Sequence, residues 1–118
     1  MTGDERQEEG QRAQLLKGLA ELALLSLLDG EPRYGLDILE SLRRDAGLAL
    51  AEGTIYPLLH RLERAKLTRA EWRLDEGGAR PRKYYALTKQ GRAGLARQLE
   101  EWRQISASLG KFLERRRR

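Results

Sequence analysis

The hydrophobic period of the chain changes after Lys66, and this change limits the folds that the chain can adopt. Before it, residues 15–28, 32–46 and 52–66 repeat apolar side chains with the three-to-four spacing of helices. After it, residues 67–74 and 82–87 alternate as strands do, and the segment DEGGARP between them is rich in turn-forming residues. The pattern therefore predicts three helices followed by a β-hairpin.

Residues 88–114 are predicted to form a long final helix through which the chain pairs with a copy of itself. Thr88 can cap the start of this helix. The seam residues are spaced alternately four and three apart, as in a two-helix coiled coil, and Ser106 fills the slot after Trp102. The seam residues are Leu95, Leu99, Trp102, Leu109 and Leu113. A helical chain of 118 residues with 35% charged side chains often completes its core by pairing, so we expect a homodimer.

The order of the elements predicts the fold class. Three helices followed by a two-stranded wing form the winged helix-turn-helix arrangement. The predicted fold is mostly α with a small β-hairpin: a winged helix-turn-helix DNA-binding domain at residues 13–87, and a long C-terminal dimerisation helix at residues 88–114. Residues 1–12 have no apolar period and are predicted to be a flexible N-terminal tail, and residues 115–118 form a basic tail.

The positive charge is concentrated in the middle of the chain. The net charge is +5, and the segment from Arg61 to Lys83 holds eight Lys or Arg residues against four acids. A basic hairpin beside a helical body is a common way to grip a duplex, because a helix enters the major groove and the loop reaches a neighbouring groove or phosphates. Double-stranded DNA is therefore the expected partner.

Other classes of protein are disfavoured by what the sequence lacks. Cysteine is absent and His60 is the single histidine, so no metal or other cofactor is expected. The longest apolar run, Leu22–Leu28, is too short to span a bilayer, and the acidic start does not resemble a signal peptide. No pair of carboxylates, nucleophile–base set or phosphate-binding loop indicates an enzyme. We therefore expect a cytoplasmic protein that is not an enzyme and has no membrane partner.

The helix predicted at residues 52–66 contains both Gly53 and Pro57, the residue types least suited to a helix interior. A start at or just before Thr54 would place Pro57 in the first turn, where its missing N–H costs no helical hydrogen bond. A start at Glu52 would remove one such bond. We favour the first start. The face opposite the apolar stripe is short of bulk, which suits close contact with another surface, and the helix N-terminus favours phosphate.

Three segments carry a resemblance to a known family. RYGLDILESL, EGTIYPLLHRLERAKLT and GGARPRKYYALTKQGR resemble the PadR family of bacterial winged-helix transcription regulators, and the similarity covers roughly residues 15–114. The single C-terminal helix is similar to the short branch of the family, which dimerises through that helix. Ala51 departs from the family pattern, because many relatives have a helix-capping serine there and alanine cannot cap.

The resemblance implies a homodimer that binds a two-fold symmetric operator, often as a repressor released by a small molecule. The candidate DNA-binding residues lie at the start of the second helix, on the outward face of the third helix and in the wing. They are Tyr34, Thr54, Tyr56, His60, Arg61, Arg64, Arg80, Arg82 and Lys83. Trp102 is either a dimer anchor or, with Ser106 beside it, an effector-binding residue for flat aromatic or cationic molecules.

Two alternatives to a DNA-binding repressor stay open at this point. The winged helix could dock a protein with its basic face, although obligate protein interfaces are depleted in charge at their core. The chain could instead be a multidrug-type sensor in which the binding of flat aromatic ligands at the dimer interface dominates.

Overall fold

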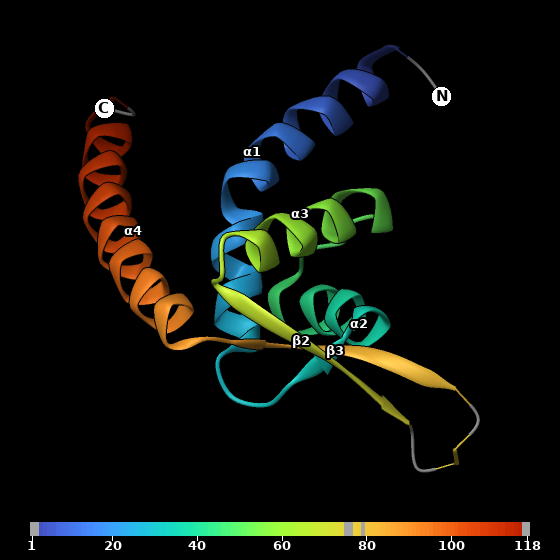
Figure 1. The fold of residues 1–118 in the computed structure, drawn as a ribbon. Coiled ribbons are helices and arrows are strands. Elements are labelled where there is room, and N and C mark those ends of the chain that lie inside the picture. Colours follow the sequence, from blue (N-terminus) through green and yellow to red (C-terminus); the bar gives the residue numbers. More distant parts are fainter. Residues whose placement is uncertain (1–2, 75–76, 79, 117–118) are drawn as a thin grey trace.

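The computed structural model describes residues 3–74, 77–78 and 80–116, which form four helices and a small sheet (Figure 1). The elements follow in the order α1 Gly3–Leu28, β1 Arg33–Tyr34, α2 Gly35–Ala46, α3 Glu52–Arg64, β2 Thr68–Leu74, β3 Pro81–Leu87 and α4 Lys89–Arg116. The hairpin of β2 and β3 projects away from the helices, and α4 runs along one flank. The predicted fold class, mostly α with a winged helix and one long C-terminal helix, is confirmed.

The hairpin belongs to a three-stranded antiparallel sheet in the order β1-β3-β2. β2 and β3 pair along their whole length, from Thr68 opposite Leu87 to Leu74 opposite Pro81. β1 adds two residues to the other edge of β3. The sequence pattern does not predict β1, because two residues are too few to show alternation. The second helix consequently starts later than expected, at Gly35, and residue 34 belongs to the strand.

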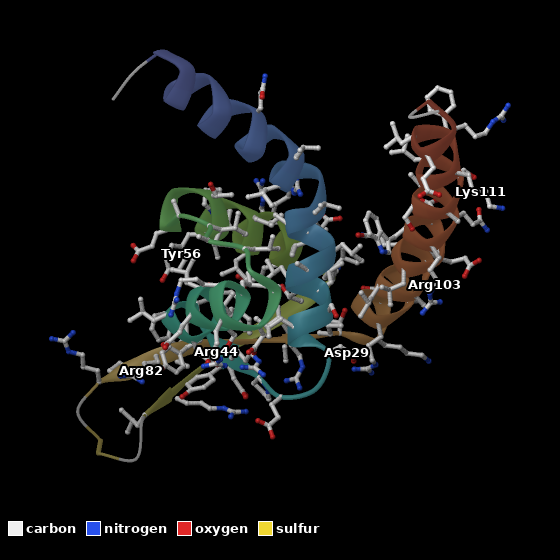
Figure 2. All side chains as sticks on the ribbon, turned by 180° about the vertical axis from the view of Figure 1, so that it is seen from behind. Asp29, Arg44, Tyr56, Arg82, Arg103 and Lys111 are labelled. Carbon is white, nitrogen blue, oxygen red and sulfur yellow. The ribbon has the colours of Figure 1, made fainter. Side chains whose placement is uncertain are left out.

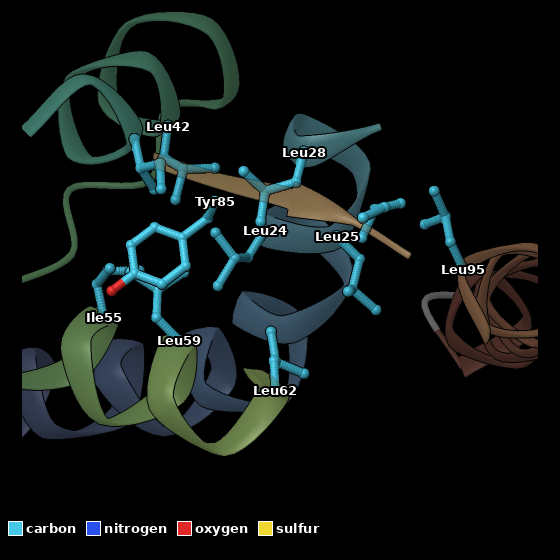
Figure 3. Close-up of a cluster of buried hydrophobic side chains, with 11 residues drawn as sticks. Leu24, Leu25, Leu28, Leu42, Ile55, Leu59, Leu62, Tyr85 and Leu95 are labelled. Carbon is cyan, nitrogen blue, oxygen red and sulfur yellow. The ribbon is translucent and has the colours of Figure 1, made fainter. Parts of the chain in front are cut away.

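The core lies where α1, α2, α3 and the sheet meet (Figure 3). Its buried apolar side chains are Leu24, Leu25, Leu28, Ile38, Leu42, Ile55, Leu59, Leu62, Tyr85, Leu87 and Leu95. α1 packs against α2, α4 and β3. A helix with neighbours on several sides needs apolar residues nearly all round, which explains the composition of residues 15–28.

The first helix begins much earlier than the sequence pattern predicts. α1 starts at Gly3, so residues 3–12 of the predicted N-terminal tail are helical. This stretch is rich in Glu, Gln and Arg, which are good helix formers, and extending an existing helix requires no apolar stripe. Figure 1 shows that this half of α1 extends past α3 and away from the core.

The start of α4 is fixed to the loop between α3 and β2. The hydroxyl of Thr88 accepts a hydrogen bond from the backbone N–H of Gly91 at 3.0 Å, so the predicted helix cap is confirmed. The same hydroxyl donates to the carbonyl of Lys66 at 2.6 Å, and the N–H of Thr88 donates to the carbonyl of Leu67 at 3.1 Å. Gly91 packs so tightly here that a Cβ on it would overlap the Leu67 carbonyl oxygen.

α4 divides into a part packed on the body and a part that is exposed. Leu95 is buried in the core and Leu99 packs partly against it, so these two predicted seam residues contact the body of their own chain. Farther along, the apolar side chains are between 45% and 59% exposed. They are Trp102, Ile105, Leu109, Phe112 and Leu113. We call these five residues the α4 stripe.

Candidate nucleic-acid interface

The third helix begins at Glu52, so the favoured start near Thr54 is wrong. The N–H groups of Thr54 and Ile55 both donate to the carbonyl of Ala51, at 3.0 and 3.1 Å. Ala51 is the N-cap residue and offers no side-chain hydrogen bond. Pro57 is therefore the sixth helical residue, beyond the first turn, and leaves the carbonyl of Gly53 without its helical partner. Gly53 is exposed, so water can take the place of the missing N–H.

The two faces of α3 differ as the sequence predicts. Ile55, Leu59 and Leu62 are buried in the core. The other face is exposed along its whole length and carries the predicted DNA-binding residues of this helix. The exposed residues there are Gly53, Thr54, Tyr56, Pro57, His60, Arg61 and Arg64. Because Gly53 and Pro57 are small, this face is open to close approach by another surface.

Tyr56 lies between α3 and the start of α2 (Figure 2). A Cβ built on Gly35 would lie 2.7 and 2.9 Å from Cε1 and Cζ of the Tyr56 ring, and closer still to its hydroxyl. Only glycine leaves room for the ring at this position. The side chain remains 39% exposed, and burial raises the pKa of its hydroxyl above the usual value. Tyr56 is thus held in place while part of its edge stays accessible.

Arg61 does not simply point outward, because it forms an ion pair with Glu21 of α1 at 2.9 Å. The other carboxylate oxygen of Glu21 accepts a hydrogen bond from Nε2 of Gln98 in α4, also at 2.9 Å. Glu21 therefore connects α3 with α4. Glu21 is not among the residues predicted from the sequence, although an acid within a helix that is apolar nearly all round is a signal that could have identified it.

Arg61 and Arg64 border a groove of about 800 Å³ between α1 and α3. Its lining is mainly apolar or small and comes from α1, from the loop before α3 and from the first half of α3. The other lining residues are Leu16, Ala20, Ala49, Leu50, Ala51, Gly53, Thr54, Pro57 and Leu58. The guanidinium-bearing side chains of α3 therefore border an apolar hollow as well as the exposed face of the helix.

The predicted wing residues lie on two different faces of the sheet. Lys83 faces α3 and pairs with Glu63 at 3.1 Å, and this hydrogen bond raises the pKa of Lys83. On the opposite face, the guanidinium of Arg82 lies 4.5 Å from the centre of the Tyr34 ring. Tyr34 meets Tyr84 edge to face, with ring centroids 5.4 Å apart. The structure therefore separates Lys83 from Tyr34 and Arg82.

Arg80 is exposed near the tip of the hairpin, beside residues that lie outside the described part of the chain. Arg73, which is not among the predicted site residues, has its guanidinium 5.1 Å from the centre of the Tyr84 ring and pairs with Glu71. The missed signal was the register of the hairpin, which places Arg73 opposite Arg82 on the Tyr34 face. This face is a row of alternating guanidinium groups and rings.

The predicted effector residues lie on α4. Trp102 belongs to the α4 stripe and is 45% exposed, while Ser106 is half-buried one turn farther on. The hydroxyl of Ser106 donates to the carbonyl of Arg103 at 3.3 Å. Among the described residues, no group of three or more His, Cys, Asp or Glu side chains gathers to hold a metal ion. None of the helices within those residues is both long and apolar enough to cross a membrane.

A helical body with a basic two-stranded wing and a long terminal helix defines this chain as a winged-helix protein. Residues 24–97 match the family described as "Transcriptional regulator PadR-like family", so the chain belongs to the PadR-like family of transcriptional regulators. This match confirms the resemblance carried by the sequence motifs. The single C-terminal helix is consistent with the short branch of the family.

Solved structures support the same assignment. A PadR-like transcription factor from Bacteroides fragilis is 35% identical, with a TM-score of 0.70 over 87% of this chain and 98% of the relative. A PadR family regulator from Eggerthella lenta is 33% identical, with a TM-score of 0.78 over 96% of this chain and 94% of the relative.

An uncharacterised protein from Lysinibacillus sphaericus is 28% identical over 106 residues, which are 87% of this chain and 95% of that protein.

Proposed function

We propose that this chain is a homodimeric transcription repressor that binds a two-fold symmetric DNA operator and is released by a small molecule. Membership of the family supports the coarser statement, a DNA-binding transcription regulator. The geometry of α3, the wing and α4 supports the finer one.

The observation that carries the proposal is that the exposed face of α3 and the basic wing are joined. The ion pair between Lys83 of β3 and Glu63 of α3, at 3.1 Å, ties the wing to the second half of the helix. With α3 in the major groove, a wing attached there extends along the duplex toward the neighbouring phosphates. His60 and Arg64 are then the base-contacting candidates, because both are exposed and neither has Arg61's ion pair with Glu21.

The α4 stripe supports pairing of two chains. Five large apolar side chains, each about half-exposed, lie on one helix beyond its contact with the body. Burying them against the same stripe of a second chain would remove this apolar surface from water. An isologous contact of this kind gives a two-fold axis, and two reading helices related by that axis match a symmetric operator.

Selection of bound duplexes from random DNA tests this function directly. We expect an enriched inverted repeat whose half-sites are separated by about one helical turn, or about 34 Å. Arg64→Ala should then weaken binding to the selected duplex by about 1–3 kcal/mol if the side chain contacts a base. Enrichment of no duplex, or a sedimentation mass of one chain at micromolar concentration, would contradict the proposal.

Release by an effector is supported by the half-exposed indole of Trp102 with the small Ser106 one turn away. A flat aromatic cation could stack on such an indole at the interface between two chains. Planar cationic dyes should quench the fluorescence of Trp102 and displace DNA from the wild-type protein. Trp102→Ala should abolish the displacement of DNA by these dyes, and the dimer should persist in that variant.

A further inference from the structure

The side chains on the core-facing side of β2 form a row that continues past the body of the domain. Side chains alternate between the two faces of a strand, so Thr68, Ala70, Trp72 and Leu74 lie on one face. Thr68 is buried and Ala70 is half-buried, whereas Trp72 and Leu74 are each 68% exposed. The row therefore begins in the core and ends as an apolar surface on the wing, which the described residues leave open.

The two strands that carry this apolar surface are cationic. β2 and β3 together carry Arg69, Arg73, Arg82 and Lys83, against Glu71 as the single acid of the two strands. Trp72 lies directly opposite Lys83 in the strand register. Lys83 shares the face of Trp72, whereas Arg69, Arg73 and Arg82 lie on the opposite face of the hairpin. A hairpin that enters a groove turns both faces toward the phosphate backbones, so phosphates attract the cations while sugars and base edges accept the ring. Protein interfaces, by contrast, are depleted in charge at their core.

The position of the row relative to α3 favours one groove. Lys83, the cross-strand partner of Trp72, contacts Glu63 near the end of α3, so Trp72 lies where the wing leaves this helix. The strand rises about 3.3 Å per residue, so Trp72 lies about 13 Å and Leu74 about 20 Å along the strand from Thr68. Half a turn of B-DNA is about 17 Å. With α3 in the major groove, the wing is long enough to reach the adjacent minor groove.

We propose that Trp72, supported by Leu74, packs against the sugar and base edges of the minor groove that flanks the half-site. This inference rests on the proposed DNA-binding function and adds a contact that carries no charge. Stacking and wedge contacts of aromatic side chains are independent of counterion release, whereas contacts of Arg and Lys with phosphates depend on it. Salt dependence therefore distinguishes the two kinds of contact.

The test compares Trp72→Thr, which keeps a good strand former, with Trp72→Phe, which keeps an aromatic ring. Affinity for the selected operator duplex is measured across a range of salt concentrations, after thermal melting has shown that each variant is folded. We expect Trp72→Thr to weaken binding about tenfold with an unchanged salt slope, and Trp72→Phe to retain most of the affinity. Hydroxyl-radical cleavage of the flanking minor-groove sugars should increase in the Trp72→Thr complex.

A direct readout comes from fluorescence in a Trp102→Phe background, where Trp72 is the sole tryptophan. We expect the duplex to quench this tryptophan and to shield it from acrylamide. Unchanged affinity and unchanged cleavage in Trp72→Thr, or an indole that stays open to acrylamide in the complex, would overturn the inference. The matched variant is Arg64→Ala. If Arg64→Ala weakens binding and Trp72→Thr does not, the Trp72 contact is disproved while the proposed DNA-binding function is kept. If neither variant changes the affinity, the proposed DNA interface is disproved as well.

Discussion

Replacing Gly91 with alanine should destabilise the fold more than any other glycine-to-alanine change in α4. A Cβ at this position would overlap the backbone oxygen of Leu67, and it would lie 3.0 Å from the Leu67 carbonyl carbon and 3.1 Å from Cδ2 of Leu87. Carbon and oxygen atoms in contact need about 3.3 Å or more, so the start of α4 and the Leu67 loop must separate by about 1 Å. Backbone, unlike the end of a flexible side chain, cannot move aside alone.

The separation disrupts two interactions that hold α4 to the body. The hydrogen bond that the N–H of Thr88 donates to the Leu67 carbonyl is worth about 1 kcal/mol, and the one that the Thr88 hydroxyl donates to the Lys66 carbonyl is worth about 1 kcal/mol. Overpacking adds about 1–3 kcal/mol, and the better helix propensity of alanine returns about 1 kcal/mol. The net loss is about 2–4 kcal/mol, which should lower the melting temperature of a chain of this size by about 10 °C.

Gly94→Ala is the matched control on the same helix. Gly94 is also buried, but a Cβ there would meet its nearest atoms, from Arg97 and Leu67, at 3.8 Å, which is an ordinary contact. We expect it to melt at or slightly above the wild-type temperature, because alanine favours the helix by up to about 1 kcal/mol. Both variants should be melted at one protein concentration, since pairing of chains would shift the midpoint. A Gly91→Ala protein as stable as Gly94→Ala would refute this account of the junction.

Three further changes test contacts at the candidate interface. In Gly35→Ala the new methyl group displaces the Tyr56 ring, so the pKa of the Tyr56 hydroxyl should move nearer its ordinary value. Spectrophotometric titration measures this pKa, with Tyr56→Phe as the control that lacks the hydroxyl. An unchanged pKa would contradict the packing of Tyr56 against Gly35. The Glu63 hydrogen bond raises the pKa of Lys83 in the folded chain, so the pair stabilises the fold below about pH 10.5, and this contribution is lost as the pH rises through the folded-state pKa. Urea titrations measure the difference in unfolding free energy between the wild type and Lys83→Met. This difference should be below about 1 kcal/mol at neutral pH and should shrink at higher pH. A difference that grows with pH would be inconsistent with the ion pair. Glu21→Gln removes the charge that holds Arg61, so we expect tighter binding to duplex DNA in fluorescence anisotropy, whereas weaker binding would show that the ion pair orients Arg61 for DNA.

The parts of the fold that the sequence predicts are those that depend on local patterns. The change from a helical to an alternating period locates the helices and the hairpin, because each element needs one apolar face toward the core. The cap at Thr88 is likewise readable, since the hydroxyl acts on a backbone N–H three residues away. The exposed face of α3 follows from the positions of Ile55, Leu59 and Leu62. All of these signals lie within a few residues of the element they define.

What the sequence does not predict depends on contacts between distant residues. Glu21 meets Gln98 across 77 positions of the chain, and Lys83 meets Glu63 across 20. The start near Thr54 was favoured because it places Pro57 in the first turn, whereas the helix begins at Glu52 and leaves the exposed Gly53 carbonyl without its helical partner. The sequence therefore predicts which face of α3 is exposed, but the pairing of Arg61 with Glu21 could not be foreseen.

The long last helix acts as a stiff arm that leaves the body at one point. Its packing on the core ends near Leu99, and the remaining residues up to 116 extend over about 25 Å at 1.5 Å per residue. A tilt of only about 5° at that exit would move the far end by about 2 Å. If two chains pair through α4, the distance between their α3 helices depends on the angle at which α4 leaves each body near Leu99. A small change of that angle would then bring the two α3 helices closer to, or farther from, the spacing of successive major grooves.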